Sequence, residues 1–244
     1  MASAYPYLYC VLFLLIILAI FLYGAGQHRR ICIIVGLFYM FVLPLYLPFE
    51  EEYWQPNRLG GWILGIEDLM LLFVCGSAPW AVVAAILRDR LKTDLNWTTF
   101  FLRYGWLAFL GIGIFLLLLF LGWSAICSSI TAQLLISILV LSFRPDLWML
   151  GLISLLVWMP IYLSILKISY LLWPEFKTIW NLTGFWGNTL YGLPIGEILW
   201  MISGVWGYPV AIGYIVNANI RLGSIRKRPD SSTDKCRRQS HTTF

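Results

Sequence analysis

The sequence predicts an all-α, polytopic membrane protein with about seven transmembrane helices. Of its 244 residues, 60% are hydrophobic and only 12% are charged, whereas soluble domains are about 45–50% apolar and about 25% charged. The apolar residues form several continuous runs of the ~20 residues that one spanning helix needs. Because lipid satisfies no backbone polar group, only helices or closed barrels span a bilayer, and these runs do not alternate as barrel strands do.

Seven apolar runs define the predicted spans. The first run has no basic region before it and no clear cleavage site before Arg29, so we interpret it as a span and not as a signal peptide. A short connection near Trp123 and Ser124 separates the fourth run from the fifth. The predicted spans are residues 5–25, 30–49, 61–87, 101–123, 124–143, 147–172 and 190–218.

The basic residues are strongly biased to one side of this arrangement. Only Arg58, Lys167 and Lys177 fall on the other side, and an even number of spans would break the sorting. The positive-inside rule then predicts an outside N-terminus and a cytoplasmic C-terminal tail. The other 14 of the 17 basic residues are Arg29, Arg30, Arg88, Arg90, Lys92, Arg103, Arg144, Arg221, Arg226, Lys227, Arg228, Lys235, Arg237 and Arg238.

The C-terminal tail, residues 221–244, is polar, basic and predicted to be disordered. We interpret its charge, and the net charge of +5 of the whole chain, as attraction to anionic lipid headgroups and not as a sign of nucleic-acid binding. The cysteines form no CxxC pair, and we expect them to be small buried side chains. They are Cys10, Cys32, Cys75, Cys127 and, in the tail, Cys236.

Three acidic residues, Glu67, Asp68 and Glu197, lie inside apolar stretches. Ionisable groups within a membrane are costly and usually face the bundle interior, which makes these three candidate functional residues. The alternative is that each carboxylate belongs to the first turn of its helix and complements the helix dipole. We expect the run of Glu50, Glu51 and Glu52 to lie in a solvated loop. We expect the remaining acids on the basic side to pair with their neighbours; they are Asp89, Asp94, Asp146, Asp230 and Asp234.

Two segments of the chain share one pattern. The sequences PFEEEYW (residues 48–54) and PEFKTIW (residues 174–180) each lead through a Gly-, Asn- and Trp-rich loop into an acid-bearing span, and Asp68 aligns with Glu197. We predict two parallel three-helix repeats whose acids meet at one depth, near an axis along the membrane normal. The predicted units are a first repeat at 1–98, a linking helix at 99–123, a second repeat at 124–220 and the tail at 221–244.

At these motifs the sequence resembles the lycopene cyclase domain family, small membrane carotenoid cyclases that occur as two three-span subunits or as one fused chain. The family pattern places a Pro and a Trp after one helix, then a glycine-rich loop, then Ile-Pro-x-Glu-Glu. The second half is most similar, and the resemblance covers nearly the whole chain. It rests on Pro174, Glu175, Trp180, Asn181, the segment GLPIGEILW from Gly192, Gly204 and Pro209, and on Trp54, Pro56, GIED from Gly65 and Phe73. The chain departs from the pattern at Gly65, where the family has Pro, and at Gly196, where it has the first Glu.

The resemblance implies carotenoid biosynthesis, by acid-catalysed and non-redox cyclisation of linear, lycopene-type ends. An acid protonates the terminal double bond, the carbocation closes to a ring, and a base removes a ring proton. Burial favours the protonated form of a carboxyl, neighbouring carboxyls titrate apart, and aromatic faces stabilise a cation. The candidate catalytic residues are Glu67, Asp68 and Glu197, with Glu197 expected to be essential. The candidate substrate-binding residues are Trp54, Trp62, Trp180, Trp186, Trp200 and Glu175.

No cofactor and no metal is predicted. The chain lacks a GxGxxG turn after a strand and lacks HExxH and CxxC patterns, and its two histidines, His28 and His241, lie far apart in the sequence. The expected partners are a hydrophobic isoprenoid or carotenoid substrate and membrane lipids, with no nucleic acid.

Other functions fit parts of the sequence. Acids at one depth also suit a small transporter or channel, although they have no counterpart on the inner side. A divergent protein that binds or modifies an isoprenoid lipid, or a scaffold, fits the loss of an acid at Gly196. A retinal receptor is excluded because residues 190–218 contain no lysine. Tryptophans also gather at membrane interfaces without any chemistry.

Overall fold

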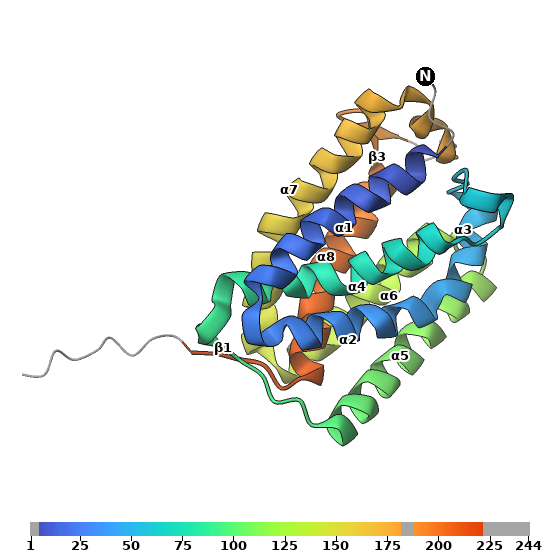
Figure 1. Cartoon of the computed structure of the whole chain (residues 1–244). Helices are drawn as coiled ribbons and strands as arrows, with labels where there is room; N and C mark the ends of the chain where they lie inside the picture. The colour runs from blue at the N-terminus through green and yellow to red at the C-terminus, as the bar shows by residue number, and fades with distance from the viewer. Residues whose placement is uncertain (1–4, 182–187, 222–244) are drawn as a thin grey trace, which may run out of the picture.

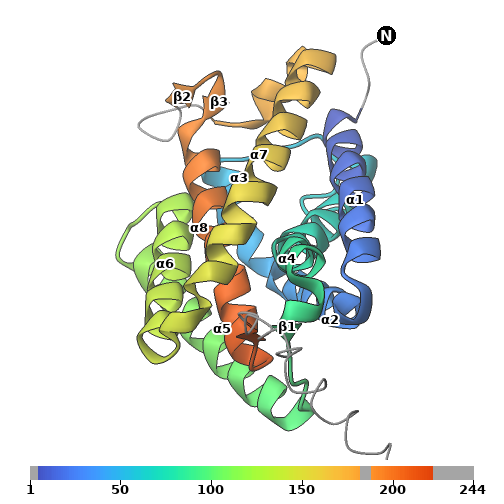
Figure 2. The ribbon, with the colours of Figure 1, turned by 90° about the vertical axis from the view of Figure 1, so that its left-hand side faces the viewer.

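A computed structural model describes residues 5–181 and 188–221 and confirms the all-α architecture (Figures 1 and 2). Seven helical segments in these residues are long and apolar enough to cross a membrane, which fits a multi-pass membrane protein. The α-helices are α1 (Pro6–Gly24), α2 (Arg29–Tyr39), α3 (Leu47–Glu52), α4 (Ile66–Leu87), α5 (Trp97–Phe120), α6 (Ala125–Phe143), α7 (Trp148–Leu172) and α8 (Ile195–Ile215).

Short elements connect these helices. The strands are β1 (Leu91–Lys92), β2 (Thr189–Leu190), β3 (Leu193–Pro194) and β4 (Asn219–Ile220), and β1 pairs with β4 and β2 with β3, both antiparallel. The 3-10 turns are η1 (Gly26–His28), η2 (Met40–Tyr46), η3 (Leu59–Gly61), η4 (Arg88–Arg90), η5 (Pro145–Leu147) and η6 (Pro174–Ile179).

The second predicted span, 30–49, is not one regular α-helix. It consists of α2, the 3-10 turn η2 and the short helix α3 in succession, with Pro44 inside η2. A proline removes one backbone donor and its ring clashes with the carbonyl four residues earlier, so the α-helical ladder is interrupted there. The interruption turns the chain toward the interior, so that Tyr46 and Phe49 become buried.

Two predicted spans begin later than the sequence indicates. The third was expected from residue 61, but α4 starts at Ile66, because Gly60 and Gly61 adopt positive φ angles that no helix contains. The seventh was expected from residue 190, but β2 and β3 first form a hairpin. Its two-residue turn, Tyr191 and Gly192, has positive φ at both positions, as a type I′ turn requires.

Helices α4 and α8 form the centre of the bundle. Helix α4 packs against α1 and α2, α8 packs against α6 and α7, and the two central helices also contact each other. The other helices surround this pair, and α5 is the most exposed of the seven segments (Figure 2). The three acids found in apolar stretches therefore belong to the two most buried helices of the structure.

Small residues let α2 approach α4 closely. A Cβ added at Gly36 would lie 2.8 Å from Cδ2 of Phe73, and one added at Gly76 would lie 2.5 Å from Cβ of Tyr39. Glycine at both contacts removes these clashes, which is a common device of helix pairs in membranes.

Basic residues of several connections gather at one end of the bundle. His28 in η1 lies 3.3 Å from the carbonyl oxygen of Arg88 in η4, and the β1–β4 pair ties the α4–α5 connection to the chain after α8. The Arg144 guanidinium donates to Asp146 and to the carbonyl of Ala218, both at 2.7 Å. The hydrogen bond to Asp146 raises the pKa of Arg144 above its usual value. The predicted tail, apart from Arg221, lies outside the described residues.

Candidate functional site

The connections that precede α4 and α8 meet at the opposite end of the bundle. Trp54 and Trp180 form an isolated antiparallel bridge. Two reciprocal backbone hydrogen bonds flank it, from Gln55 to Ile179 at 2.7 Å and from Asn181 to Tyr53 at 2.8 Å. In each bond the residue after one tryptophan donates to the residue before the other tryptophan. The two segments are therefore related as by a local twofold axis. The two segments that share the Pro and Trp spacing are therefore in direct contact.

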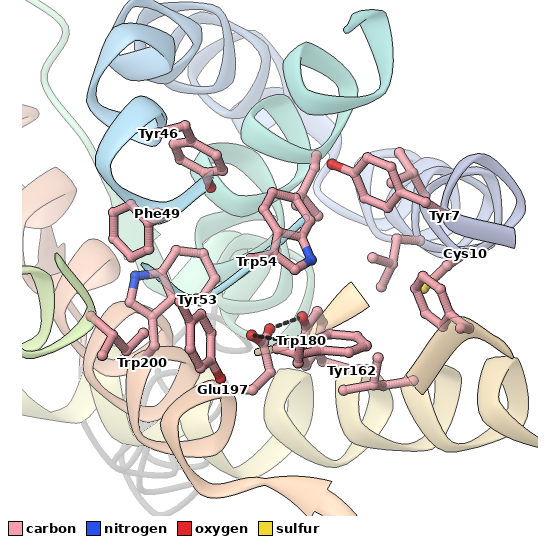
Figure 3. A pocket seen from close by; sticks show the side chains of 16 residues that line it. Tyr7, Cys10, Tyr46, Phe49, Tyr53, Trp54, Tyr162, Trp180, Glu197 and Trp200 are labelled. Atoms are coloured by element: carbon pink, nitrogen blue, oxygen red, sulfur yellow. Dashed lines mark hydrogen bonds between the residues drawn. The ribbon is translucent and has the colours of Figure 1, made fainter. Parts of the chain in front are cut away.

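A chamber of about 50 Å³ lies beneath this bridge. Its wall draws on α1, the η2–α3 segment, α4, α6, α7, η6 and α8, so both halves of the chain contribute (Figure 3). Glu197 is the one acidic residue of the wall. Nine aromatic side chains line it: Tyr7, Tyr46, Phe49, Tyr53, Trp54, Tyr162, Phe176, Trp180 and Trp200. We call this cavity the Glu197 chamber.

Glu197 lies in the first turn of α8, which is the structural role that the sequence left open for it. Its side chain is buried, and both carboxyl oxygens accept hydrogen bonds from neutral donors (Figure 3). The Tyr162 hydroxyl donates to Oε1, and the Trp180 indole N–H donates to Oε2 at 3.3 Å. Within residues 5–181 and 188–221, no basic side chain lines the chamber. This carboxyl is therefore a buried acid held by two aromatic residues, with no cation to balance a negative charge.

Asp68 has a different environment. Its Oδ2 accepts the Gly65 backbone N–H at 2.6 Å, which caps α4, and its Oδ1 accepts the Tyr7 hydroxyl at 2.9 Å. Arg58 donates to both oxygens, at 2.6 and 3.2 Å. Arg58 is itself buried and also pairs with Glu50. Asp68 is thus an ion-paired helix cap, and Tyr7 stands between it and the Glu197 chamber.

Arg58 joins this network to the tryptophan bridge. Its guanidinium lies 5.6 Å from the ring centroid of Trp54, within the range of a cation–π contact. Burial alone lowers the pKa of Arg58, but the hydrogen bonds to Glu50 and Asp68 raise it above the usual value. The guanidinium therefore stays charged and holds the loop before α4 in place.

The Glu50–Glu52 run was expected to be a solvated loop, but it ends the short helix α3; Glu52 is exposed as expected, and Glu50 is only partly so. Glu50 pairs with the buried Arg58. The Glu52 Oε2 atom accepts the backbone N–H of Ala125 at 2.6 Å and so caps α6. Both carboxylates therefore have a structural partner, and the charge of Arg58 and the open N-terminus of α6 supply the physical reason.

Glu67 is fully buried outside the Glu197 chamber. Its Oε1 accepts the Leu59 backbone N–H at 2.6 Å, and its Oε2 has no hydrogen-bond partner. Like Asp68, it lies in the first turn of α4. Glu67 is thus a first-turn residue of α4 that holds the preceding loop through Leu59.

Asp68 and Glu197 both point into the protein, but they do not touch. Side-chain and backbone contacts run between them: Asp68 accepts from Tyr7, the Tyr7 and Trp54 rings meet edge to face at 5.1 Å, and the backbones of Trp54 and Trp180 form the antiparallel bridge. Trp180 then donates to Glu197. The aligned acids therefore lie on opposite sides of an aromatic wall.

The predicted tryptophans have three different locations. Trp54, Trp180 and Trp200 line the chamber, whereas Trp62 is 72% exposed and points away from it. Trp62 follows the Gly60 and Gly61 turn, which directs the chain outward. Glu175 is also exposed, and Trp186 lies outside the described residues.

Sequence reasoning missed the tyrosines of the chamber. Tyr7, Tyr46, Tyr53 and Tyr162 supply hydroxyl groups in its wall. Three of them lie within apolar runs, where a tyrosine is a weak signal because its ring suits a membrane interface equally well. The sequence could have indicated these tyrosines only if the inward-facing side of each helix had been known.

Gly196 leaves room for Tyr53. A Cβ at position 196 would lie 2.9 Å from the Tyr53 hydroxyl oxygen and 3.2 Å from its ring. Burial raises the pKa of Tyr53 well above its usual value. The tyrosine therefore occupies the space that a second acid would need if the cyclase pattern were complete.

No family model, no curated protein and no solved structure matches the chain. Among residues 5–181 and 188–221, no three His, Cys, Asp or Glu side chains are grouped closely enough to hold a metal ion. The resemblance to lycopene cyclase domains stays a prediction from short motifs.

Proposed function

We propose that this chain is a membrane enzyme that cyclises a linear, lycopene-type isoprenoid end without net oxidation or reduction. The observation that carries the proposal is the Glu197 chamber, which combines one buried acid with nine aromatic side chains and no basic residue. Protonation of an alkene needs a neutral acid in a dry site. The carbocation that results is stabilised by aromatic faces. The Arg58 guanidinium, 5.6 Å from the Trp54 ring centroid, is paired with Glu50 and Asp68, which offset its positive charge.

Glu197 is the proposed proton donor. Its carboxyl proton adds to the terminal carbon–carbon double bond, and the resulting carbocation forms a new carbon–carbon bond to an internal double bond, which closes the ring. The Glu197 carboxylate then takes a proton from the ring carbon next to the cation. The acid is restored and the product is an isomer of the substrate, so no cofactor or oxidant is consumed.

Tyr162 and Trp180 are proposed positioning residues. Both donate to the Glu197 oxygens, and these bonds strengthen when the carboxyl becomes a carboxylate. Glu67 and Asp68, although proposed from the sequence as catalytic, lie outside the chamber. In this proposal they hold the α4 end and, through Tyr7, one wall of the site.

The same proposal includes an orientation. The basic end of the bundle faces the cytoplasm, and the Trp54–Trp180 end faces outward. The 14-to-3 bias of the basic residues supports it.

The test is pigment analysis in cells that accumulate lycopene. We expect ringed products from the native chain and a loss of about 10²–10⁴ in rate for Glu197→Gln. Asp89→Asn is the matched control, because Asp89 is exposed at the opposite end of the bundle. Tyr162→Phe, which keeps the ring but loses the donor, should be slower than the native chain. Ring formation by Glu197→Gln at the native rate, at equal protein levels, would refute the assignment.

A protein that binds isoprenoids without converting them is the second candidate. The chamber volume of about 50 Å³ favours it. An engineered cavity that binds benzene in another protein measures about 150 Å³, so the chamber is smaller than a cavity known to hold a six-membered ring. Retention of linear pigment on the purified native chain, without any ringed product, would select this alternative.

A further inference from the structure

A second and larger cavity lies beside the Glu197 chamber. It measures about 220 Å³ and is lined by α2, the η2–α3 segment, α5, α6 and α8, and by Gly76 of α4. Its wall is mainly apolar. The polar exceptions include Gln133 and Ser203, which bond to each other at 2.6 Å. Such a cavity inside a helix bundle suits an apolar chain.

The two cavities share part of their walls. Tyr46, Phe49 and Trp200 line both of them. Trp200 is held from the α6 side, because its indole N–H donates to Ser129 at 3.0 Å, and Phe49 stacks on Phe115 of α5 at 6.1 Å. These three aromatic side chains therefore stand in the wall of the larger cavity and in the wall of the chamber that holds the acid.

The volumes show which cavity can hold the greater part of a ligand. An engineered cavity of about 150 Å³ accommodates benzene, and one water occupies about 30 Å³ in the liquid. The Glu197 chamber, at about 50 Å³, takes little more than the tip of a chain, whereas the second cavity exceeds the benzene example. Any longer substrate that reaches Glu197 must place its body elsewhere.

Tyr46 brings a buried, unpaired hydroxyl to the shared wall. The residue is 8% exposed, and its hydroxyl has no hydrogen-bond partner. In Figure 3 this hydroxyl points from the η2 turn toward the chamber. An unpaired buried hydroxyl costs about 1–3 kcal/mol, and the π-electrons of an alkene can accept a weak hydrogen bond from it.

We propose that the two cavities form one continuous site for a linear polyisoprenoid. The second cavity holds the body of the chain, and Tyr46, Phe49 and Trp200 form the passage through which one end reaches Glu197. The inference rests on the proposed function for the role of that end. The location of the chain body rests on the cavities alone.

The experiment measures binding and photolabelling with a geranylgeranyl alcohol that carries a diazirine at its hydrocarbon end. Gly111→Leu is the main variant, because Gly111 lines the second cavity and an added Cβ makes only an ordinary 3.6 Å contact with Ile136. Gly113→Leu is the matched control: the same change on the same helix, at an exposed position with nothing within 4 Å. We expect label on α6 and α8 residues of the second cavity, and about tenfold weaker binding for Gly111→Leu alone.

Chain length sharpens the measurement. The shorter geranyl probe should lose much less affinity in Gly111→Leu, because it needs less of the second cavity. Ala108→Leu, another residue of this wall, repeats the test if Gly111→Leu does not fold. Equal binding by the Gly111→Leu and Gly113→Leu chains, or label only on the exposed helix faces, would overturn the proposal.

Glu197→Gln separates this inference from the proposed function. The variant should bind and be labelled as the native chain is, while forming no ring. If it still forms rings, the acid assignment fails but the labelling pattern still supports the shared site. If the native chain forms rings while no label enters the second cavity, the shared site fails and the acid assignment stands.

Discussion

Replacing Arg58 by leucine should destabilise the protein strongly. Arg58 makes two hydrogen bonds to Asp68 and pairs with Glu50, and its side chain is 3% exposed and that of Asp68 0%. Each bond to a charged partner contributes about 1.5–3 kcal/mol. These values are not additive, and removing one partner of a buried ion pair typically costs about 3–5 kcal/mol. We expect a loss in that range, because solvent cannot screen the two carboxylates left behind.

Unfolding in mixed micelles by added dodecyl sulfate, followed by tryptophan fluorescence, measures this loss. Arg58→Lys should fall between the native chain and Arg58→Leu, since an ammonium group keeps the charge but cannot form the two-pronged contact with Asp68. In an Asp68→Asn background the cost of Arg58→Leu should shrink, because the uncompensated charge at 68 is gone. A cost below about 1 kcal/mol, or an unchanged cost in that background, would show that the network is not structural.

Three further predictions concern packing and orientation. Gly36→Leu should destabilise the α2–α4 contact, whereas Gly105→Leu, with nothing within 4 Å of an added Cβ, should unfold like the native chain. Gly196→Ala should cost about 1–3 kcal/mol by overpacking against the Tyr53 hydroxyl. Part of that cost should vanish in a Tyr53→Phe background, which removes the hydroxyl but keeps the ring 3.2 Å away, and an equal cost there would contradict the hydroxyl contact. A single cysteine at Asn181 should react with an impermeant reagent from outside intact cells, and one at Ser232 should not; the reverse result would invert the proposed orientation.

The number and positions of the helices follow from apolar run length, because a bilayer sets that length directly. The start of α4 cannot be predicted from run length, since Trp62, Ile63 and Leu64 are as apolar as the residues of the helix that follows. Backbone geometry decides it: Gly60 and Gly61 take positive φ angles, and Asp68 bonds to the Gly65 N–H. The 3-10 turn at Pro44 could be expected from the proline, but not that it would bury Tyr46.

The candidate site was only partly predictable. The cost of a charge in a membrane indicated Glu67, Asp68 and Glu197, and the structure buries all three. The sequence could not indicate that Arg58 would fold inward to meet Asp68, since a lone basic residue in a connecting segment is ordinarily solvated. It also could not place Tyr162, whose hydroxyl meets Glu197 from a position 35 residues earlier in the chain. Such contacts depend on how α7 and α8 cross.

The different partners of the two aligned acids separate their roles. Asp68 has a buried guanidinium beside it, so the protein itself supplies a positive charge to this carboxylate. Glu197 has only the neutral donors Tyr162 and Trp180, so its charge is balanced only when a positive charge enters the chamber. In the proposed cyclisation, the carbocation formed by proton transfer from Glu197 is such a charge, and it would appear at the moment when the carboxylate does. A chamber of this kind stabilises the pair of charges more than it stabilises either the neutral acid or the neutral substrate, which is the condition for catalysis.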